Sequence, residues 1–163
     1  VIARRFAALG FEVRGYARTP RSIEGVATFA GSDQLAAFAD GLDIVVSVLP
    51  LTPETTGIMG EDFFGMLADG AFIINAGRGP QVNDDDLLAA LKSGKLGGAA
   101  LDVFAVEPLP QDHPFWANHK VRVWPHVAAQ TNATSAAEQV AAAITAMMDG
   151  KEPANRVDWS RGY

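Results

Sequence analysis

The segment AFIINAGRGPQVNDDDLLAALKSG, residues 71–94, contains a strand, a loop and a helix in that order. Residues 71–76 are almost entirely apolar, which is typical of a strand that is buried on both faces of a sheet. Residues 83–94 predict a helix, because Asn83 can cap it, acids fill its first turn and Gly94 follows its last turn. A buried strand followed by such a helix is one unit of an α/β fold.

The same alternation extends in both directions from this segment. Strands that are apolar on both faces and separated by helices predict a parallel, doubly wound sheet. The other expected strands are 11–17, 43–50, 98–104 and 121–125, and the other expected helices are 1–9, 32–40 (with Ser32 as N-cap), 61–69 and 131–150.

The domain boundary is expected near residues 126–133, because the long helix after it no longer follows the strand rhythm. We expect a first domain over residues 1–128, and a helix and tail over residues 129–163 that pack on a different domain. The chain opens within an amphipathic helix that ends at Gly10, so it is expected to be a fragment that lacks the strand before that helix.

Composition and charge exclude several classes of function. The 163 residues, 48% of them hydrophobic, predict a globular protein with a sizeable core. The net charge of −6 and the absence of a basic cluster argue against binding to nucleic acid or to an anionic membrane. The chain has no cysteine, which excludes disulfides and thiolate metal sites and permits a reducing compartment. No stretch approaches the roughly 20 apolar residues of a membrane span, so we expect a cytoplasmic protein.

Three chemically active side chains follow three of the expected strands. In open α/β sheets, ligands bind beyond the carboxyl ends of the strands. Arg78, Glu107 and His126 should therefore gather at one edge of the sheet. Taken alone, Arg78 would suit a surface ion pair equally well.

An arginine, a histidine and a carboxylate at one edge suit the reduction of a 2-oxo acid. The guanidinium of Arg78 can bind the substrate carboxylate through two hydrogen bonds. A protonated His126 can donate a proton to the carbonyl oxygen as hydride reaches the carbon, and Glu107 can stabilise the protonated ring. The glycines beside Arg78 are interpreted as room for ligands to approach the backbone.

The chain contains the motifs INAGRG (74–79), LDVFAVEPLP (101–110) and WPHVAAQT (124–131), in this order. Together these motifs resemble the D-isomer-specific 2-hydroxyacid dehydrogenases, and the resemblance covers nearly the whole chain. The ending VDWSRGY and the turn YARTPRS resemble most closely the glyoxylate/hydroxypyruvate reductase branch. The resemblance implies a Rossmann-type nucleotide domain, a nicotinamide cofactor, a small 2-oxo acid substrate, a homodimer, and catalytic roles for Arg78, Glu107 and His126.

The turn after the first complete strand favours NADP(H) over NAD(H). A Rossmann unit that binds NAD commonly has an acid there, whereas an arginine accommodates the 2′-phosphate of NADP. This chain has Arg18, with Thr19 and Arg21 beside it, although these residues would also fit a solvated basic turn. The resemblance further implies that Leu49, Pro50 and Thr55 lie under the adenine and ribose, that Gly77 lines the nicotinamide, and that Asp102 holds its carboxamide.

Other polar residues have simpler interpretations. Asp102 would also serve as a turn cap. His113 and His119 are expected to be loop residues, since only His126 follows a strand. Asp84, Asp85 and Asp86 resemble a metal cluster but are expected to favour the start of a helix instead, so no metal is predicted.

Alternative functions remain open from the residues alone. The family's Gly-rich phosphate turn and most of its substrate domain are not in this sequence, so the isolated chain is expected to bind the cofactor poorly. A dehydrogenase of another D-2-hydroxy acid, or a silent nucleotide-binding protein of the same fold, would share these motifs. A phosphoryl-accepting signalling domain is disfavoured, because Asp43 precedes its strand and Asp84, Asp85 and Asp86 open a helix, so these acids do not converge at the strand ends.

Overall fold

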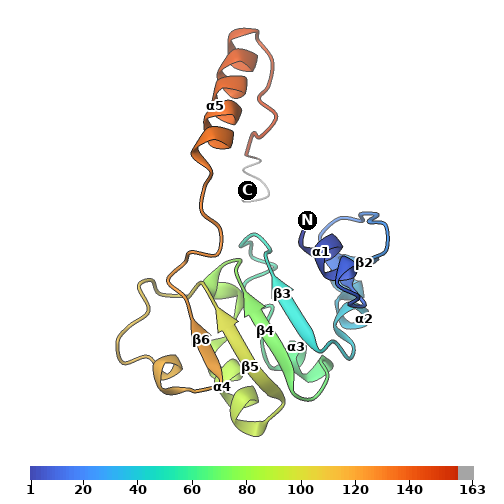
Figure 1. The fold of residues 1–163 in the computed structure, drawn as a ribbon, viewed down its shortest axis with the longest axis vertical. Coiled ribbons are helices and arrows are strands. Elements are labelled where there is room, and N and C mark those ends of the chain that lie inside the picture. The colour runs from blue at the N-terminus through green and yellow to red at the C-terminus, as the bar shows by residue number, and fades with distance from the viewer. Residues whose placement is uncertain (158–163) are drawn as a thin grey trace.

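The structure is a computed structural model of the chain and describes residues 1–157. Strands and helices alternate along it (Figure 1). The helices are α1 (Ile2–Ala8), α2 (Leu35–Ala39), α3 (Glu61–Met66), α4 (Asp84–Ser93) and α5 (Ala133–Met148). The strands are β1 (Arg14–Ala17), β2 (Ala27–Ala30), β3 (Ile44–Ser47), β4 (Ala71–Asn75), β5 (Leu96–Leu101) and β6 (Val121–Val123), and 3₁₀ turns lie at η1 (Ser32–Gln34), η2 (Gly79–Gln81) and η3 (Pro114–Ala117).

The predicted parallel sheet is confirmed. Strands β3, β4, β5 and β6 pair in parallel in the order in which they occur in the chain. Asn75, the last residue of β4, is in register with Ser47 at the end of β3 and with Leu101 at the end of β5. The loops that follow these strands therefore leave the sheet at one edge. Strands β1 and β2 form a separate two-stranded parallel sheet.

One face of the four-stranded sheet is packed against α3 and α4, which lie behind it in Figure 1. Alternate residues of β4 point to this side, and Ile73 is fully buried in a core that includes Phe64 and Leu87. The opposite face is also apolar, as expected for a sheet of this class. There, Phe72 and Ile44 are 51% and 43% exposed within the described part of the chain.

Helix α4 forms because its ends are capped as the sequence predicts. The side chain of Asn83 accepts hydrogen bonds from the amides of Asp85 and Asp86, and Gly94 adopts the left-handed conformation at the C-cap. The three aspartates of the first turn face the positive end of the helix dipole. Asp86 also accepts a hydrogen bond from the amide of Glu61, which links α4 to the start of α3.

Some local predictions were wrong. Strand β2 was not predicted. Ser32 does not cap α2, because that segment starts as the 3₁₀ turn η1 after Gly31, which has a φ of 80°. The side chain of Gln34 instead accepts a hydrogen bond from the amide of Ala30. Strands β3 and β5 both end three residues earlier than expected, so residues 48–50 and 102–104 are loops beyond the carboxyl edge.

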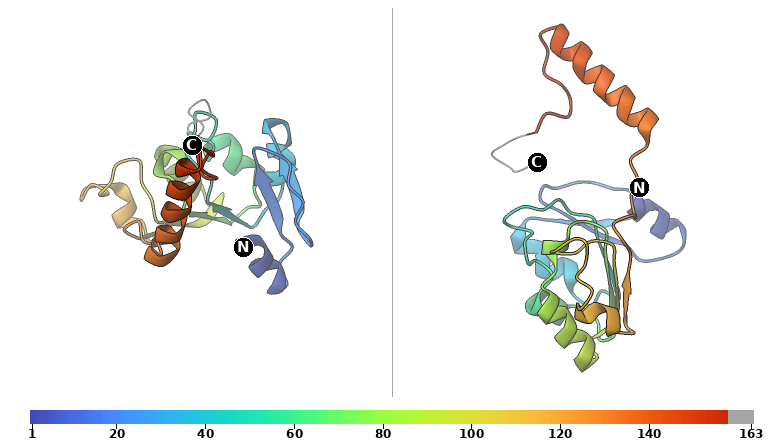
Figure 2. Two further views of the ribbon diagram at one scale, coloured as in Figure 1. Left: turned by 90° about the horizontal axis from the view of Figure 1, so that it is seen from above. Right: turned by 90° about the vertical axis from the view of Figure 1, so that its left-hand side faces the viewer.

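Helix α5 extends away from the rest of the molecule (Figures 1 and 2). Its side chains include exposed apolar residues such as Val140, Ile144 and Met147. This position suits the predicted role of residues 129–163 in covering another domain, which remains a prediction. The motif VDWSRGY lies almost wholly in residues 158–163, outside the described residues. None of the helices within residues 1–157 has the length and apolar character needed to cross a membrane.

Candidate functional site

The loop after β4 carries Arg78 at the carboxyl edge of the sheet. Its shape is set by Asn75, a fully buried residue at the end of the strand. The Asn75 side chain accepts a hydrogen bond from the amide of Gly77 (3.0 Å) and donates one to the carbonyl of Arg78 (3.0 Å). Because both ends of the side-chain amide are hydrogen-bonded, Asn75 fixes the backbone conformation of Gly77 and Arg78, from which the arginine side chain extends.

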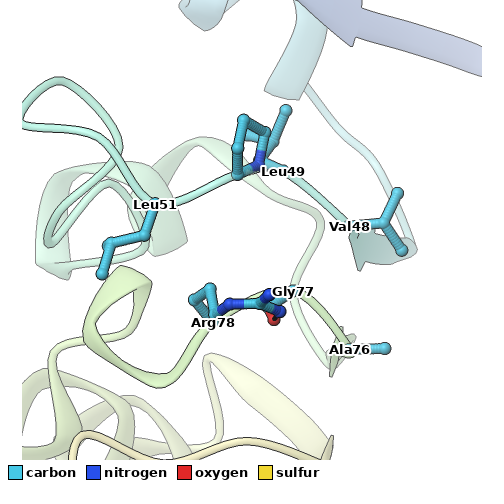
Figure 3. A pocket seen from close by; sticks show the side chains of 7 residues that line it. Val48, Leu49, Leu51, Ala76, Gly77 and Arg78 are labelled. Atoms are coloured by element: carbon cyan, nitrogen blue, oxygen red, sulfur yellow. Dashed lines mark hydrogen bonds between the residues drawn. The ribbon is translucent and has the colours of Figure 1, made fainter. Parts of the chain in front are cut away.

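The Arg78 side chain is exposed and lies beside a small cavity. Its Nη1 donates to the carbonyl of Gly77 (2.7 Å), and it forms no ion pair with a carboxylate of residues 1–157. The structure therefore gives no support to a surface ion pair. The cavity has a volume of about 410 Å³, and Figure 3 shows Arg78 and Gly77 opposite Leu49 and Leu51 across it.

Glu107 and His126 form the pair that the sequence predicts. The Nδ1 atom of His126 lies 2.8 Å from Oε2 of Glu107. The other carboxylate oxygen, Oε1, accepts a hydrogen bond from the amide of Phe104 (2.9 Å), which fixes the orientation of the glutamate. With Nδ1 engaged, Nε2 of the ring is the atom left to exchange a proton with a ligand.

The carboxylate of Glu107 is stabilised in its charged form. The hydrogen bond with His126, the amide of Phe104 and the charge of Arg78 lower the pKa of Glu107, in that order of size. Because its pKa is lowered, the stabilising effect of this group is present above its usual titration range and is lost only as pH falls through the lower value. The structure brings Glu107 and His126 into direct contact, and the guanidinium of Arg78 lies within electrostatic reach of Glu107, as the smallest of the effects on its pKa.

Asp102 holds the loop that carries His126. Its carboxylate oxygens accept hydrogen bonds from the amides of Val127 (2.8 Å) and Ala128 (2.9 Å), and the residue is buried. His126 itself has a φ of 57°, a left-handed conformation that is uncommon for residues other than glycine. Two charge-assisted hydrogen bonds directly after it stabilise this backbone. Asp102 thus acts as a turn cap, and its contact with a carboxamide remains a prediction.

Asp102→Asn is expected to destabilise the protein by about 1–3 kcal/mol. The side-chain NH₂ group of the new asparagine would face one of the two backbone N–H groups, which would then have no acceptor. Chemical denaturation measures the change. Asp69→Asn is the matched control, since Asp69 pairs with Lys95 but its side chain is 91% exposed. Equal stability of the two variants would show that the Asp102 carboxylate does not hold the loop.

The glycines on either side of Arg78 have a different role from the one expected. A Cβ atom on Gly79 would lie 1.8 Å from the carbonyl carbon of Phe104, and one on Gly77 would lie 2.6 Å from Oε1 of Gln81. The space beside both glycines is filled by the protein's own chain. The expectation that they leave room for ligands is wrong in this respect, because they allow loops of the site to pack together.

The remaining predicted cofactor residues lie at two neighbouring loops. Leu49 and Pro50 line the cavity. The hydroxyl of Thr55 donates to the carbonyl of Pro50 (2.8 Å) and accepts from the amide of Thr52 (2.8 Å), so in this structure it shapes the loop.

Arg18, Thr19 and Arg21 are exposed beyond the carboxyl end of β1. The hydrogen bond from Thr52 lowers the pKa of Glu54, and the charge of Arg18 adds to this effect. Arg18 therefore lies near the loop after β3.

The other histidines are loop residues, as expected. His113 lies against Phe115, with ring centroids 4.4 Å apart, and accepts a hydrogen bond from the Phe115 amide. Its Nε2 is 3.5 Å from Asp84, whose pKa is raised by burial, an effect that His113 opposes. His119 is exposed, and its carbonyl accepts a hydrogen bond from Arg122.

Sequence reasoning missed the buried polar residues behind the site. Ser47, Asn75 and Gln81 are all buried, although each belongs to a residue type that is usually exposed. The only signal in the sequence was their position, at the ends of apolar strands or just after Arg78.

A parallel α/β sheet with its polar side chains gathered beyond the carboxyl edge defines a Rossmann-type nucleotide-binding domain. The sequence model of the D-isomer specific 2-hydroxyacid dehydrogenase NAD binding domain matches residues 1–128. The chain belongs to the D-isomer specific 2-hydroxyacid dehydrogenase family.

Three relatives illustrate the match. Glyoxylate/hydroxypyruvate reductase A of Serratia proteamaculans is 48% identical over 162 residues, which is 99% of this chain and 52% of that protein. A D-isomer specific 2-hydroxyacid dehydrogenase from Xanthobacter autotrophicus Py2, solved with NADPH and MES, is 46% identical with a TM-score of 0.95, covering 99% of this chain and 66% of that one. The NADPH-dependent glyoxylate/hydroxypyruvate reductase of Sinorhizobium meliloti, solved with NADP and sulfate, is 41% identical with a TM-score of 0.93 over 99% of this chain and 52% of that one. The predicted family is confirmed, and the chain spans about half the length of the curated relatives it matches.

Proposed function

We propose that this chain is the cofactor-binding part of an NADPH-dependent reductase that converts glyoxylate and hydroxypyruvate to the corresponding 2-hydroxy acids. The observation that carries the proposal is the hydrogen bond of 2.8 Å between His126 and Glu107. The pair lies at the carboxyl edge, close enough to Arg78 for its charge to act on Glu107. A domain that only bound a nucleotide would need no proton donor of this kind.

Each residue of the site has a separate role in the proposed reaction. Arg78 binds the substrate carboxylate, and its positive charge polarises the neighbouring carbonyl group. His126 donates the proton from Nε2 to the carbonyl oxygen, while the Nδ1 side of the ring stays bonded to Glu107. Glu107 stabilises the positive charge of the ring before the transfer and keeps it oriented throughout.

The residues around the cavity fit a nicotinamide nucleotide. The cavity is lined by the apolar side chains of Val48, Leu49 and Leu51 on one wall and by the loop of Gly77 and Arg78 on the other. Such walls suit a flat ring, and a cationic side chain at the end of β1 suits a phosphate. A bound nicotinamide nucleotide would supply the hydride for the reduction.

NADP(H) is preferred over NAD(H) in this proposal, although NAD(H) also fits the family. The support comes from Arg18, which is exposed at the carboxyl end of β1. Two relatives of known structure, from Xanthobacter autotrophicus Py2 and Sinorhizobium meliloti, were solved with NADPH and NADP. Thr19 and Arg21 would take part in the same contact.

Arg18→Ala is expected to raise the Kd for NADPH by about 10- to 100-fold, because one charged hydrogen-bond donor to the 2′-phosphate is lost. The Kd for NADH should stay within about twofold, since NADH has no phosphate there. Fluorescence titration measures both constants. Lys92→Ala removes the same charge from the exposed end of α4 and serves as control. Equal losses for the two nucleotides would overturn the assignment of Arg18.

The activity is tested in the full-length form, meaning this chain joined to the remaining half that its curated relatives have. Oxidation of NADPH is followed with glyoxylate, hydroxypyruvate, pyruvate and phosphohydroxypyruvate. We expect the first two to be reduced with the highest kcat/KM. Preference for another acid would support a different D-2-hydroxyacid dehydrogenase, and NADPH binding without any turnover would support a silent nucleotide-binding protein.

We also propose that the protein is a cytoplasmic homodimer. The absence of cysteine fits a reducing compartment. The exposed apolar residues of the open sheet face and of α5 are available for packing against further protein. Light scattering of the full-length form measures its mass, and a monomer at micromolar concentration would contradict the dimer.

A further inference from the structure

Gln81 is the most completely engaged side chain near the cavity. It is fully buried in η2, and its amide makes four hydrogen bonds. Nε2 donates to the carbonyls of Leu49 (2.9 Å) and Pro50 (3.1 Å), and Oε1 accepts from the hydroxyl of Ser47 (3.1 Å) and the amide of Arg78 (3.2 Å). A primary amide has two N–H donors and two acceptor lone pairs, so its capacity is used completely.

These four bonds join the two walls of the cavity. Ser47 and Asn75 are the last paired residues of β3 and β4, and the amide of Ala76 donates to the carbonyl of Ser47 just beyond them. Past that point the two loops that follow these strands line the cavity, with Leu49 on one loop and Arg78 on the other. Gln81 spans from one backbone to the other behind the opening.

The fit around Gln81 is close. A Cβ atom on Gly77 would lie 2.6 Å from Oε1 of Gln81 and 3.0 Å from the carbonyl oxygen of Leu49. The backbone of Gln81 is held as well, since its carbonyl accepts a hydrogen bond from the amide of Met59 (2.9 Å). With its backbone fixed and its side chain saturated, Gln81 has little freedom to change the distance between the walls.

We propose that Gln81 is a positioning residue that sets the spacing between the cofactor loop at Leu49–Pro50 and the substrate-binding Arg78. It acts through the backbone of both loops and has no contact with the reacting atoms. The inference rests on the proposed function, because it assigns the two loops to the two ligands of one reaction. Its structural part, that Gln81 ties the loops together, does not depend on the identity of the substrate.

The test uses Gln81→Leu and Gln81→Glu in the full-length form. Leucine has a similar size and removes all four hydrogen bonds. Glutamate keeps an acceptor for Arg78 and Ser47 but loses the N–H donors to Leu49 and Pro50. Leu87→Ala is the control. Leu87 lies on the buried face of α4 in the hydrophobic core, so its truncation lowers stability and leaves the contacts of both loops in place.

The first readout is amide hydrogen exchange in the protein without ligands. In both Gln81 variants we expect exchange to become at least about tenfold faster in peptides that cover residues 48–52. In Gln81→Leu the same should hold for residues 76–80, whereas Gln81→Glu should protect the Arg78 amide more than Gln81→Leu does. Peptides that cover β5 should be unchanged. Acceleration spread evenly over all peptides, as expected for Leu87→Ala, would overturn the proposal, and so would no acceleration.

The second readout is the pair of constants that report binding of the two ligands, the Kd for NADPH and the KM for glyoxylate. For Gln81→Leu we expect the Kd for NADPH and the KM for glyoxylate each to rise at least about fivefold in the folded fraction. A purely structural role would lower the folded fraction and leave both constants unchanged, as in Leu87→Ala. If the parent enzyme is active and Gln81→Leu has the same Kd and KM as the parent, the inference about Gln81 is overturned and the proposed function still stands. If the parent enzyme reduces no 2-oxo acid, the proposed function fails, and the exchange experiment still decides whether Gln81 ties the loops.

Discussion

Replacing His126 with asparagine is expected to lower kcat for the reduction of glyoxylate by about 10²- to 10⁴-fold, because the site loses its proton donor. Asparagine is the best replacement for removing the imidazole while keeping the backbone. His126 has a φ of 57°, and asparagine tolerates this left-handed conformation better than most residues. The backbone of the loop should therefore survive the change. The Kd for NADPH should change by less than about twofold. Steady-state kinetics measures kcat, and fluorescence titration measures the Kd for NADPH.

The control for this prediction is His119→Asn, which removes an exposed histidine outside the site. It should leave kcat unchanged. Turnover of His126→Asn at the parent rate would show that another group supplies the proton. Glu107→Gln gives a further check, because a neutral amide no longer stabilises the protonated ring. That variant should also lose kcat, although less than His126→Asn does, because the histidine ring that donates the proton is still present.

Replacing Gly79 with alanine is expected to destabilise the protein by about 3 kcal/mol or more and to abolish most of its activity. The new Cβ would lie 1.8 Å from the carbonyl carbon of Phe104 and 2.4 Å from the amide nitrogen of Ala105. Both neighbours are backbone atoms, so the clash cannot be relieved by a change of rotamer. The loops must separate, which moves Arg78 away from Glu107 and His126.

Gly65→Ala is the matched control for this substitution. Gly65 lies within α3, and nothing would come within 4 Å of the added Cβ. Alanine there should be neutral or stabilising by up to about 1 kcal/mol, because it favours the helix more than glycine does. Chemical denaturation of both variants tests the contrast. If Gly79→Ala were as stable as Gly65→Ala, the close packing of the two loops would not exist in solution.

The parts of the fold that depend on local patterns could be predicted from the sequence. Helix α4 is the clearest case, since Asn83, the acidic first turn and Gly94 all act within a few residues of one another. Strand β4 was predictable from its apolar run, and its parallel neighbours from the alternation of elements. The position of Arg78, Glu107 and His126 beyond the carboxyl edge was predictable, because each follows a strand and the carboxyl ends of parallel strands share one edge. Their catalytic roles stay a prediction.

The parts that depend on contacts between distant segments could not be predicted. Gln81 bonds to carbonyls more than 30 residues earlier in the chain, and no local pattern marks that pairing. Gly79 was interpreted as space for a ligand because its close neighbour, Phe104, belongs to a different loop. Strand β2 is only four residues long and pairs with β1 alone, so its weak pattern did not reveal it.

The order of strands in the main sheet has a consequence for how the molecule folds. Because β3, β4, β5 and β6 are neighbours in the sheet in the same order as in the chain, each strand can dock on the one made just before it. Every new pairing closes a loop of modest length, which keeps its entropic cost low. The edge that carries the candidate site can therefore assemble progressively while the chain emerges from the ribosome, with Arg78 placed first and His126 last.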